Sequence, residues 1–299
     1  MPKIRYQEIA FKPKSLLMIQ QAEAIITEYQ RQGFILTLRQ LYYQFVARDL
    51  LTNTIRSYKQ LGSVINDARL AGLIDWNSIE DRTRNLQENP HWEGPESIVQ
   101  ACARQFRYDL WANQKVRPEV WIEKEALVGV IAGVCRELDV PFFACRGYVS
   151  QSEQWRAGRR YRDVRRASQV PLVLHFGDHD PSGIDMTRDN GERLALFAEH
   201  GVEVRRLALN MDQVQQYGCP PNPAKTTDSR FEGYMAIHGD ESWELDALEP
   251  SVIVDLIRTE VLSVRDETLW GEAVARQEEA RAQLERVADR WDEIVDTLE

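Results

Sequence analysis

Apolar residues recur at helical spacing through the first part of the chain. Between Pro13 and Gln32 they return every three or four positions, and Gly33 ends the pattern. Thr37 is placed to cap a second helix that carries apolar residues on one side. A third helix is predicted at 58–72, and the apolar residues 73–76 suit a strand or a wing. Helix, turn, helix and a short strand within about 60 residues outline a winged-helix module.

Further along, short apolar runs alternate with segments of helical period. This alternation is typical of an α/β domain built on a parallel sheet. The strands are predicted at 118–123, 140–147, 170–177 and 202–209, and the helices between them at 126–138, 152–167 and 191–201.

The chain therefore divides into four parts. Residues 1–95 are expected to form an N-terminal helix and a winged-helix, mostly α, DNA-binding domain. A Pro/Gly-punctuated stretch then leads into a connector helix at 96–117. The parallel-sheet domain follows at 118–264. A charge-rich helix at 265–299, with apolar residues interspersed, is expected to pack on the body or on a second subunit.

The charge of the chain is unevenly distributed. A net charge of -10 argues against a nucleic-acid partner, but residues 1–118 hold 16 Lys/Arg against 12 Asp/Glu, while residues 266–299 hold 4 against 11. An arginine-rich stretch also precedes the third predicted strand, where it is expected either to hold a polyanion or to form a solvated helix face. Its members are Arg156, Arg159, Arg160, Arg162, Arg165 and Arg166.

Several classes of protein are excluded by what the composition lacks. The four cysteines stand far apart without a CxxC pattern, so the sequence suggests neither a disulfide framework nor a zinc site. No stretch of about 18 uncharged apolar residues is present, and no signal-peptide run opens the chain. We expect a cytoplasmic protein with no membrane partner.

Carboxylates follow two of the predicted strands. Glu123 comes directly after the first strand, and Asp178 and Asp180 come directly after the third. The carboxyl ends of parallel strands meet at one edge of a sheet, so these side chains are expected to face one crevice. Three carboxylates suit Mg²⁺, which prefers a few such ligands together with waters and phosphate oxygens. An Asp-x-Asp pair alone is more often a solvated loop.

The segments EVWIEKEAL and GDHDPSGIDM together resemble the Toprim domain. The similarity is closest to the topoisomerase VI A-subunit group, which includes the meiotic double-strand-break transesterases, where the second segment has the form GDxDPxG. The resemblance implies a Rossmann-like fold, with Glu123, Asp178 and Asp180 as Mg²⁺ ligands. Glu244 and Asp246 lie in a segment similar to the acidic stretch after the Toprim core and are possible accessories. Three further residues either approach phosphate or lie on the surface: Lys124, Arg146 and His179.

A tyrosine motif adds to the resemblance. The same group carries a pattern like T-x-R-[DE]-[IL]-[YF]-Y in a winged-helix domain, and this chain reads TLRQLYY from Thr37 to Tyr43, with Gln40 at the acidic position. Tyr43 is then the candidate nucleophile. Arg39 shares its helix face and can stabilise the phenolate or hold the phosphate. Spacing alone favours Tyr43 as a half-buried aromatic of an amphipathic helix, and only the resemblance makes it the nucleophile; Tyr42 points to the core.

The resemblance implies a Mg²⁺-dependent DNA transesterase, a short stand-alone form of the topoisomerase VI A subunit. Tyr43, Arg39 and Glu123 are its catalytic residues, and double-stranded DNA contacts are expected at Arg69, Arg82, Arg84, Arg156, Arg159 and Arg160. In this family each site combines the tyrosine of one subunit with the metal of another, which implies a homodimer. A separate ATPase subunit would supply any ATP dependence, since the chain has no GxxxxGK[ST] loop. The alternatives are a hydrolytic Toprim nuclease of the bacterial anti-plasmid type and a non-catalytic DNA-binding protein.

Overall fold

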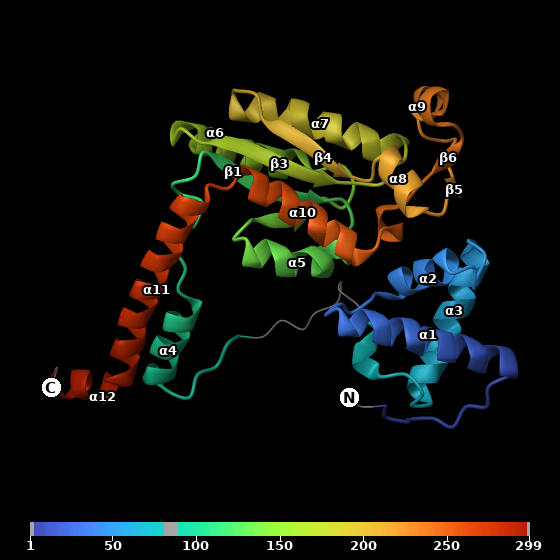
Figure 1. Ribbon diagram of the computed structural model, residues 1–299, viewed down its shortest axis with the longest axis horizontal. Coiled ribbons are helices and arrows are strands. Elements are labelled where there is room, and N and C mark those ends of the chain that lie inside the picture. The colour runs from blue at the N-terminus through green and yellow to red at the C-terminus, as the bar shows by residue number, and fades with distance from the viewer. Residues whose placement is uncertain (1–2, 81–88, 298–299) are drawn as a thin grey trace.

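A helical domain forms the first part of the computed structural model, which describes residues 3–80 and 89–297 (Figure 1). It contains α1 (Pro13–Arg31), α2 (Leu38–Ala47), α3 (Ile55–Leu70) and the short 3₁₀ helix η1 (Trp76–Ser78). The three long helices confirm the segments expected from the apolar pattern. They pack around a core that includes Ile25, Tyr29, Leu36, Leu41, Phe45, Leu61 and Ile65.

Local chemistry explains where these helices begin and end. Pro13 occupies the first turn of α1, and Gly33 follows its end with a φ of 84°, a conformation that favours glycine. At the start of α2 the Thr37 amide donates to Gln40 Oε1 at 2.9 Å, and the Gln40 amide donates to Thr37 Oγ1 at 3.3 Å. Gln40 thus completes a capping box, a local role for the residue that departs from the tyrosine motif.

The strand expected at 73–76 is not present. Asp75 instead caps η1 by accepting a hydrogen bond from the Asn77 amide at 2.7 Å, and Ile74 is buried in the helical core. Bridges of a single residue pair join Leu36 to Ile79 and Arg5 to Ala71. The described residues of this domain therefore form three packed helices without a β-hairpin wing.

A four-stranded parallel sheet forms the centre of the second domain and confirms the predicted α/β class. Its strands lie in the order β2-β1-β3-β4. Their bounds are Val116–Ile122 for β1, Phe142–Ala144 for β2, Val170–Phe176 for β3 and Glu203–Ala208 for β4.

Helices cover both faces of the sheet (Figure 1). On one face lie α5 (Val128–Glu137), which follows the 3₁₀ helix η2 (Glu125–Leu127), and α10 (Pro250–Val264); on the other lie α6 (Gln151–Arg166) and α7 (Pro181–Ala198). Alternate strand residues supply the two cores, because successive side chains of a strand point to opposite faces. Val120 and Ile122 pack in the core with α5 and α10, while Trp121 packs with α6 and α7.

The strand order places a crevice at the carboxyl ends of β1 and β3. From β1 the chain moves to β2 on one side and then returns to β3 on the other side. Open α/β sheets bind ligands at such a switch point, outside the carboxyl ends of the strands. Glu123 and Asp178 follow the two strands that flank it.

A small insert between β4 and α10 was not predicted from the sequence. It consists of α8 (Met211–Tyr217), α9 (Phe231–His238), the antiparallel pair β5 (Asn222–Pro223) and β6 (Glu241–Ser242), and the 3₁₀ helix η3 (Leu245–Ala247). Of these, η3 packs against α2 of the helical domain.

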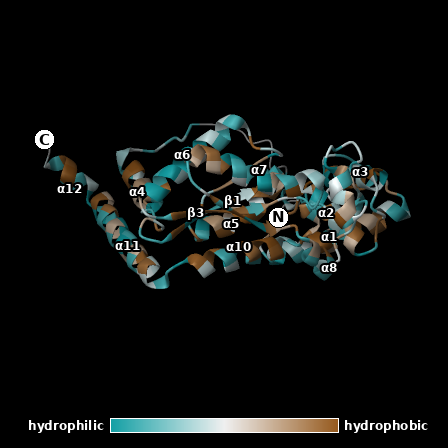
Figure 2. Cartoon of the chain, turned by 90° about the horizontal axis from the view of Figure 1, so that it is seen from above, coloured by the Kyte–Doolittle hydropathy of each residue, from teal (hydrophilic) through white to brown (hydrophobic). Residues whose placement is uncertain are grey.

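The chain ends in a helical arm. The connector helix was expected at 96–117 but is shorter, since α4 spans only Pro95–Gln105. The C-terminal helix expected at 265–299 is divided into α11 (Glu267–Asp289) and α12 (Trp291–Asp296). The long helix α11 packs against α4. Figures 1 and 2 show this arm at the opposite end of the molecule from the helical domain. Within the described ranges, none of the helices has the length and apolar character needed to cross a membrane.

Candidate functional site

The structure brings Glu123 against the loop that carries Asp178 and Asp180. The backbone of Glu123 still pairs with β3, since its amide donates to the Phe176 carbonyl at 2.8 Å. Its side chain reaches across to the same strand end, where Glu123 Oε2 accepts a hydrogen bond from the Asp178 amide at 2.9 Å. The predicted convergence of the two strand ends is therefore present.

The two aspartates use their carboxylates differently. Asp178 Oδ1 accepts a hydrogen bond from the Leu245 amide at 2.7 Å and lies 3.0 Å from Lys124 Nζ. Asp180 is the N-cap of α7, and its Oδ1 accepts from the Gly183 amide at 2.6 Å. A Cβ atom on Gly183 would lie 2.2 Å from the Asp178 carbonyl oxygen, so this tight loop requires a glycine there.

Burial and neighbouring negative charge shift the pKa values of the acids at this edge of the sheet. Burial, followed by the nearby charge of Asp178, raises the pKa of Glu123 to about 7, although the Asp178 amide hydrogen bond and Lys124 lower it. Burial also raises the pKa of Asp178, although Lys124 opposes this shift. A proton or a cation placed between these groups would relieve their repulsion.

The donor set agrees with Mg²⁺ in its chemistry, because it offers hard carboxylate oxygens whose mutual repulsion a divalent cation offsets. However, these side chains are not arranged as the ligand shell of a bound metal ion. In residues 3–80 and 89–297, no three His, Cys, Asp or Glu side chains are grouped so as to hold a metal ion. Asp178 is engaged by Lys124, and Asp180 by the N-terminus of α7.

Lys124 is the centre of an ionic cluster that motif spacing did not predict. Its Nζ atom lies 2.8 Å from Glu244 Oε2, 3.0 Å from Asp178 Oδ1 and 3.4 Å from Asp246 Oδ2. Burial disfavours the ammonium form, but the charges of these three acids outweigh burial and raise the pKa of Lys124. The residues treated as accessories in the sequence therefore form one cluster with Asp178.

Arg206 in β4 is a residue of this edge that the sequence did not reveal. Its half-buried guanidinium donates to the carbonyl oxygens of Gly177 at 2.9 Å, Asp178 at 2.6 Å, Gly183 at 2.8 Å and Leu209 at 3.0 Å. Burial lowers its pKa to about 10. Arg206 thus clamps the loop between β3 and α7 through the backbone.

His179 is turned away from the acids. Its ring is buried and Nδ1 lies 2.8 Å from the Tyr234 hydroxyl, while its backbone exchanges hydrogen bonds of 2.8 and 2.9 Å with Trp243. Burial, followed by the charge of His238, lowers its pKa to about 4. His179 therefore anchors the insert to the loop, and of the three residues considered for phosphate only Arg146, paired with Glu125, is exposed.

Tyr43 lies at the boundary between the two domains. Only 4% of the residue is exposed. Burial raises its pKa, and Glu244 raises it further, whereas Lys124 and Arg39 lower it. The Arg39 guanidinium donates to Glu244 Oε2 at 2.8 Å, so the helix that carries the tyrosine is joined to the sheet domain. Tyr42 has the core role expected, with its hydroxyl accepting from the Thr54 amide at 2.8 Å.

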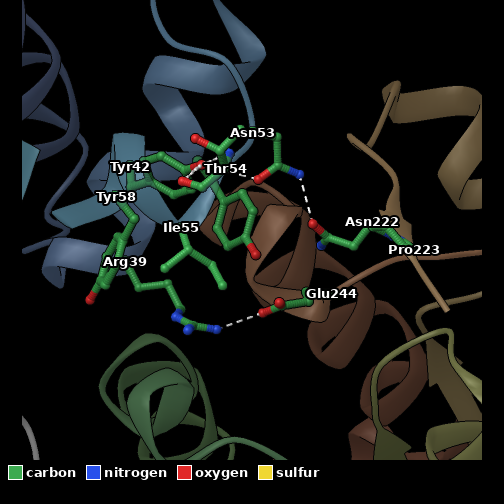
Figure 3. A pocket seen from close by; sticks show the side chains of 10 residues that line it. Arg39, Tyr42, Asn53, Thr54, Ile55, Tyr58, Asn222, Pro223 and Glu244 are labelled. Atoms are coloured by element: carbon green, nitrogen blue, oxygen red, sulfur yellow. Dashed lines mark hydrogen bonds and ion pairs between the residues drawn. The ribbon is translucent and has the colours of Figure 1, made fainter. Parts of the chain in front are cut away.

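A pocket of about 310 Å³ opens beside these residues (Figure 3). Arg39, Tyr43 and Tyr58 line it from the helical domain, and Asn222 and Glu244 line it from the sheet domain. Figure 3 shows the Arg39–Glu244 pair on one side of the pocket and the Asn53–Asn222 hydrogen bond on another. The tyrosine motif and the acidic segment thus share one cavity.

The arginines expected at DNA have varied surroundings. Arg69 donates to the Trp76 carbonyl and stacks on its ring at 4.7 Å, so it serves the interior of the helical domain. On α6, Arg160 pairs with the buried Glu119 at 2.7 Å, Arg156 pairs with Glu153 at 3.2 Å, and Arg159 stacks on Trp155. Arg82 and Arg84 lie outside the described residues. Contacts of the α6 arginines with DNA stay a prediction.

No protein-family model matches the chain, and no curated protein matches it either. The likeness to the Toprim domain and to the topoisomerase VI A-subunit group therefore depends on the short segments around Tyr43, Glu123 and Asp178.

Proposed function

We propose that this protein cleaves DNA by Mg²⁺-dependent transesterification, with Tyr43 as the nucleophile, a winged-helix-like helical domain and a Toprim-like sheet domain. One observation carries the proposal. Arg39, on the helix of the candidate nucleophile, and Lys124, beside the candidate metal ligands, both bind Glu244 Oε2 at 2.8 Å. A nucleophile motif and a carboxylate cluster far apart in the sequence thus share one polar network.

The proposed reaction breaks one phosphorus–oxygen bond for the one that it forms. The Tyr43 hydroxyl loses its proton, a bond forms between its oxygen and the phosphorus, and the bond from phosphorus to the 3′ oxygen breaks. The leaving 3′ oxygen takes up a proton, so no further reactant is needed and the reverse reaction reseals the strand. Burial, followed by the charge of Asp178, raises the pKa of Glu123 to about 7, and a bound Mg²⁺ would favour its ionised form, in which it can serve as a ligand.

Other groups would stabilise the charge that develops. Mg²⁺ held by Glu123, Asp178 and Asp180 would supply electrostatic stabilisation of the phosphate and the leaving oxygen. Arg39 is placed beside Tyr43 in the shared pocket and can bind the scissile phosphate once it is released from Glu244.

The partners follow from the same proposal. Double-stranded DNA is the substrate, and a homodimer would place two sites on opposite strands through two-fold symmetry. A separate ATPase subunit and a cytoplasmic location belong to the same proposal.

Hydrolysis by water is a second candidate, and the burial of Tyr43 favours it. A phenol that is 4% exposed and has a raised pKa is a weak nucleophile in this conformation. The carboxylates Glu123, Asp178 and Asp180 would then serve a nuclease that leaves no covalent adduct.

Covalent attachment distinguishes the two reactions. Purified protein is incubated with supercoiled plasmid and Mg²⁺, and each sample is divided before electrophoresis, with protease added to one half. Transesterification predicts nicked or linear DNA whose mobility depends on protease, and Tyr43→Phe should abolish it. The exposed Tyr6 supplies the matched control Tyr6→Phe.

Each remaining outcome has a defined meaning. Wild-type cleavage rates in Tyr43→Phe would establish hydrolysis. DNA binding without cleavage, both in the wild type and in the double variant Asp178→Ala, Asp180→Ala, would identify a non-catalytic binding protein.

A further inference from the structure

The pocket beside Tyr43 is lined by groups that suit a planar, partly polar ligand. Its volume of about 310 Å³ is at the lower end of small-molecule sites, which measure roughly 300 to 1,000 Å³. It has room for one nucleotide base but not for a duplex. Tyr58 lines the pocket, and the Arg39 guanidinium lies 5.7 Å from the centroid of its ring (Figure 3). Bases stack on both kinds of group.

The polar groups of the pocket match the edge of a base better than a phosphate. The Asn222 side chain accepts a hydrogen bond from Asn53 through Oδ1 at 2.8 Å, but its Nδ2 atom is buried and has no partner among the described residues. Glu244 presents a carboxylate to the same pocket. A carboxylate repels a phosphate, whereas the edge of a base pairs donors with acceptors. A base can therefore bond with Asn222 and Glu244 together.

An exposed apolar residue stands at the opening of the pocket. Ile55 lines the pocket and is nevertheless 76% exposed. Arg56 and Lys59, close to it on α3, are also exposed and can bind the phosphates of a strand. DNA-binding proteins insert apolar side chains of this kind between base steps and unstack them. These residues favour a base that belongs to a strand over a free nucleoside.

We infer that the pocket holds one unstacked base of the DNA, with Ile55 as the wedge and Tyr58 as the stacking ring. This inference rests on the proposed function, because it takes DNA as the partner. A base held here lies beside Tyr43 whichever subunit supplies the metal, and the half-exposed Arg39 can meet the adjoining backbone phosphate. The protein should therefore prefer DNA with an unpaired base, since such a base costs least to unstack.

Binding without cleavage tests the pocket. Two duplexes of the same sequence, one with a single unpaired nucleotide and one fully paired, are titrated by fluorescence anisotropy in EDTA. We expect about 10-fold tighter binding of the duplex with the unpaired base. Ile55→Ser should remove most of this preference, and the matched control Ile237→Ser, at a residue of α9 that is 77% exposed, should keep it.

The failures of the two proposals are distinguishable in this titration. Equal affinities of the wild type for the two duplexes overturn the pocket and leave the proposed function intact. A preference that survives in Ile55→Ser overturns the wedge. No binding to either duplex, in EDTA or in Mg²⁺, overturns both proposals.

Photochemical cross-linking locates the base. With 5-iodouracil as the unpaired base, ultraviolet light should join the DNA to the peptide that contains Tyr58, identified by mass spectrometry, and Tyr58→Leu should abolish this product. A cross-link to peptides outside the pocket overturns the assignment even if the protein cleaves DNA. Free deoxynucleosides in large excess should not displace the duplex. Displacement would assign the pocket to a free nucleoside and overturn the binding of a strand.

Discussion

The two sides of the candidate site are held in place by different means. The loop between β3 and α7 is fixed by its backbone, through the carbonyl oxygens of Gly177, Asp178 and Gly183 that accept from Arg206 and through the Asp180 cap. The junction around Tyr43 is held by side-chain pairs such as Arg39 with Glu244 and Asn53 with Asn222. Backbone bonds inside a domain persist during function, whereas side-chain pairs between domains can exchange partners. The backbone on the carboxylate side is therefore fixed, whereas the tyrosine side can adjust to a substrate.

Removing the clamp should have the largest effect. Arg206→Ala removes the guanidinium hydrogen bonds to the carbonyl oxygens of Gly177, Asp178 and Gly183, and we expect a loss of about 3 kcal/mol in the free energy of unfolding. Urea denaturation measures it. The neighbour Arg205 pairs with acids on the surface, so Arg205→Ala should cost about 0–1 kcal/mol. Equal losses in the two variants would contradict the clamp.

Acid should lower the free energy of unfolding through a buried histidine in β3, the strand before the loop. His175 in β3 is fully buried; burial, followed by Arg206, lowers its pKa to about 3. The folded state therefore binds fewer protons than the unfolded state, and His175 should reduce stability as the pH falls below about 6.5, by up to roughly 1.4 kcal/mol per pH unit. Urea midpoints between pH 7 and 4 measure the slope, which His175→Gln should flatten. The matched change at the partly buried His200 should leave the slope as in the wild type.

Mg²⁺ should stabilise the carboxylate side. Relief of the repulsion between Glu123 and Asp178 predicts a higher melting temperature, equivalent to about 2.7 kcal/mol at a concentration 100 times the Kd. Thermal denaturation with Mg²⁺ and with EDTA measures it. Glu123→Gln should remove the increase, whereas Glu125→Gln, at a residue paired with Arg146, should keep it. A wild-type melting temperature that is independent of Mg²⁺ would exclude a site at these residues.

Loosening the junction should have the smallest effect on stability. Asn53→Ala removes the side-chain hydrogen bonds to Asn222 and to the Pro221 carbonyl, and we expect a loss of about 1 kcal/mol. Hydrogen exchange should rise along α2 and η3 while the exchange of β3 stays unchanged. The variant Asn113→Ala, at a hydrogen bond far from the junction, serves as the control. A rise in exchange at β3 would indicate that the two sides are not separately held.

The sequence predicted the parts of this molecule that depend on local patterns. Helix α2 begins where Thr37 can cap it, and the strands that deliver Glu123 and Asp178 contain the short apolar runs 120–122 and 170–174. Even the cap of α7 had a signal, because Asp180 followed by Pro181 is typical of a helix start. That signal was interpreted only as metal chemistry.

The remaining features depend on contacts between distant residues. Lys124 and Glu244 are far apart in the sequence, and no spacing rule connects them. Arg206 stands in a strand pattern that gave no sign of a buried cation. The insert between β4 and α10 consists of elements too short to carry a period, so its two-residue strands could not be foreseen.

The register of β1 against β3, in which Val116 is opposite Val170 and Ile122 is opposite Phe176, has a consequence for protein engineering. A deletion of one residue inside β1 would shift the strand end by about 3.3 Å and turn Glu123 to the opposite face of the sheet. Length changes at the exposed residues 167–168 before β3 would leave this alignment intact if they keep Gln169, which is buried and donates to the Trp111 and Gln114 carbonyls. We therefore expect the sheet domain to accept inserted residues at the amino ends of these strands but not at their carboxyl ends, where Glu123 and Asp178 lie.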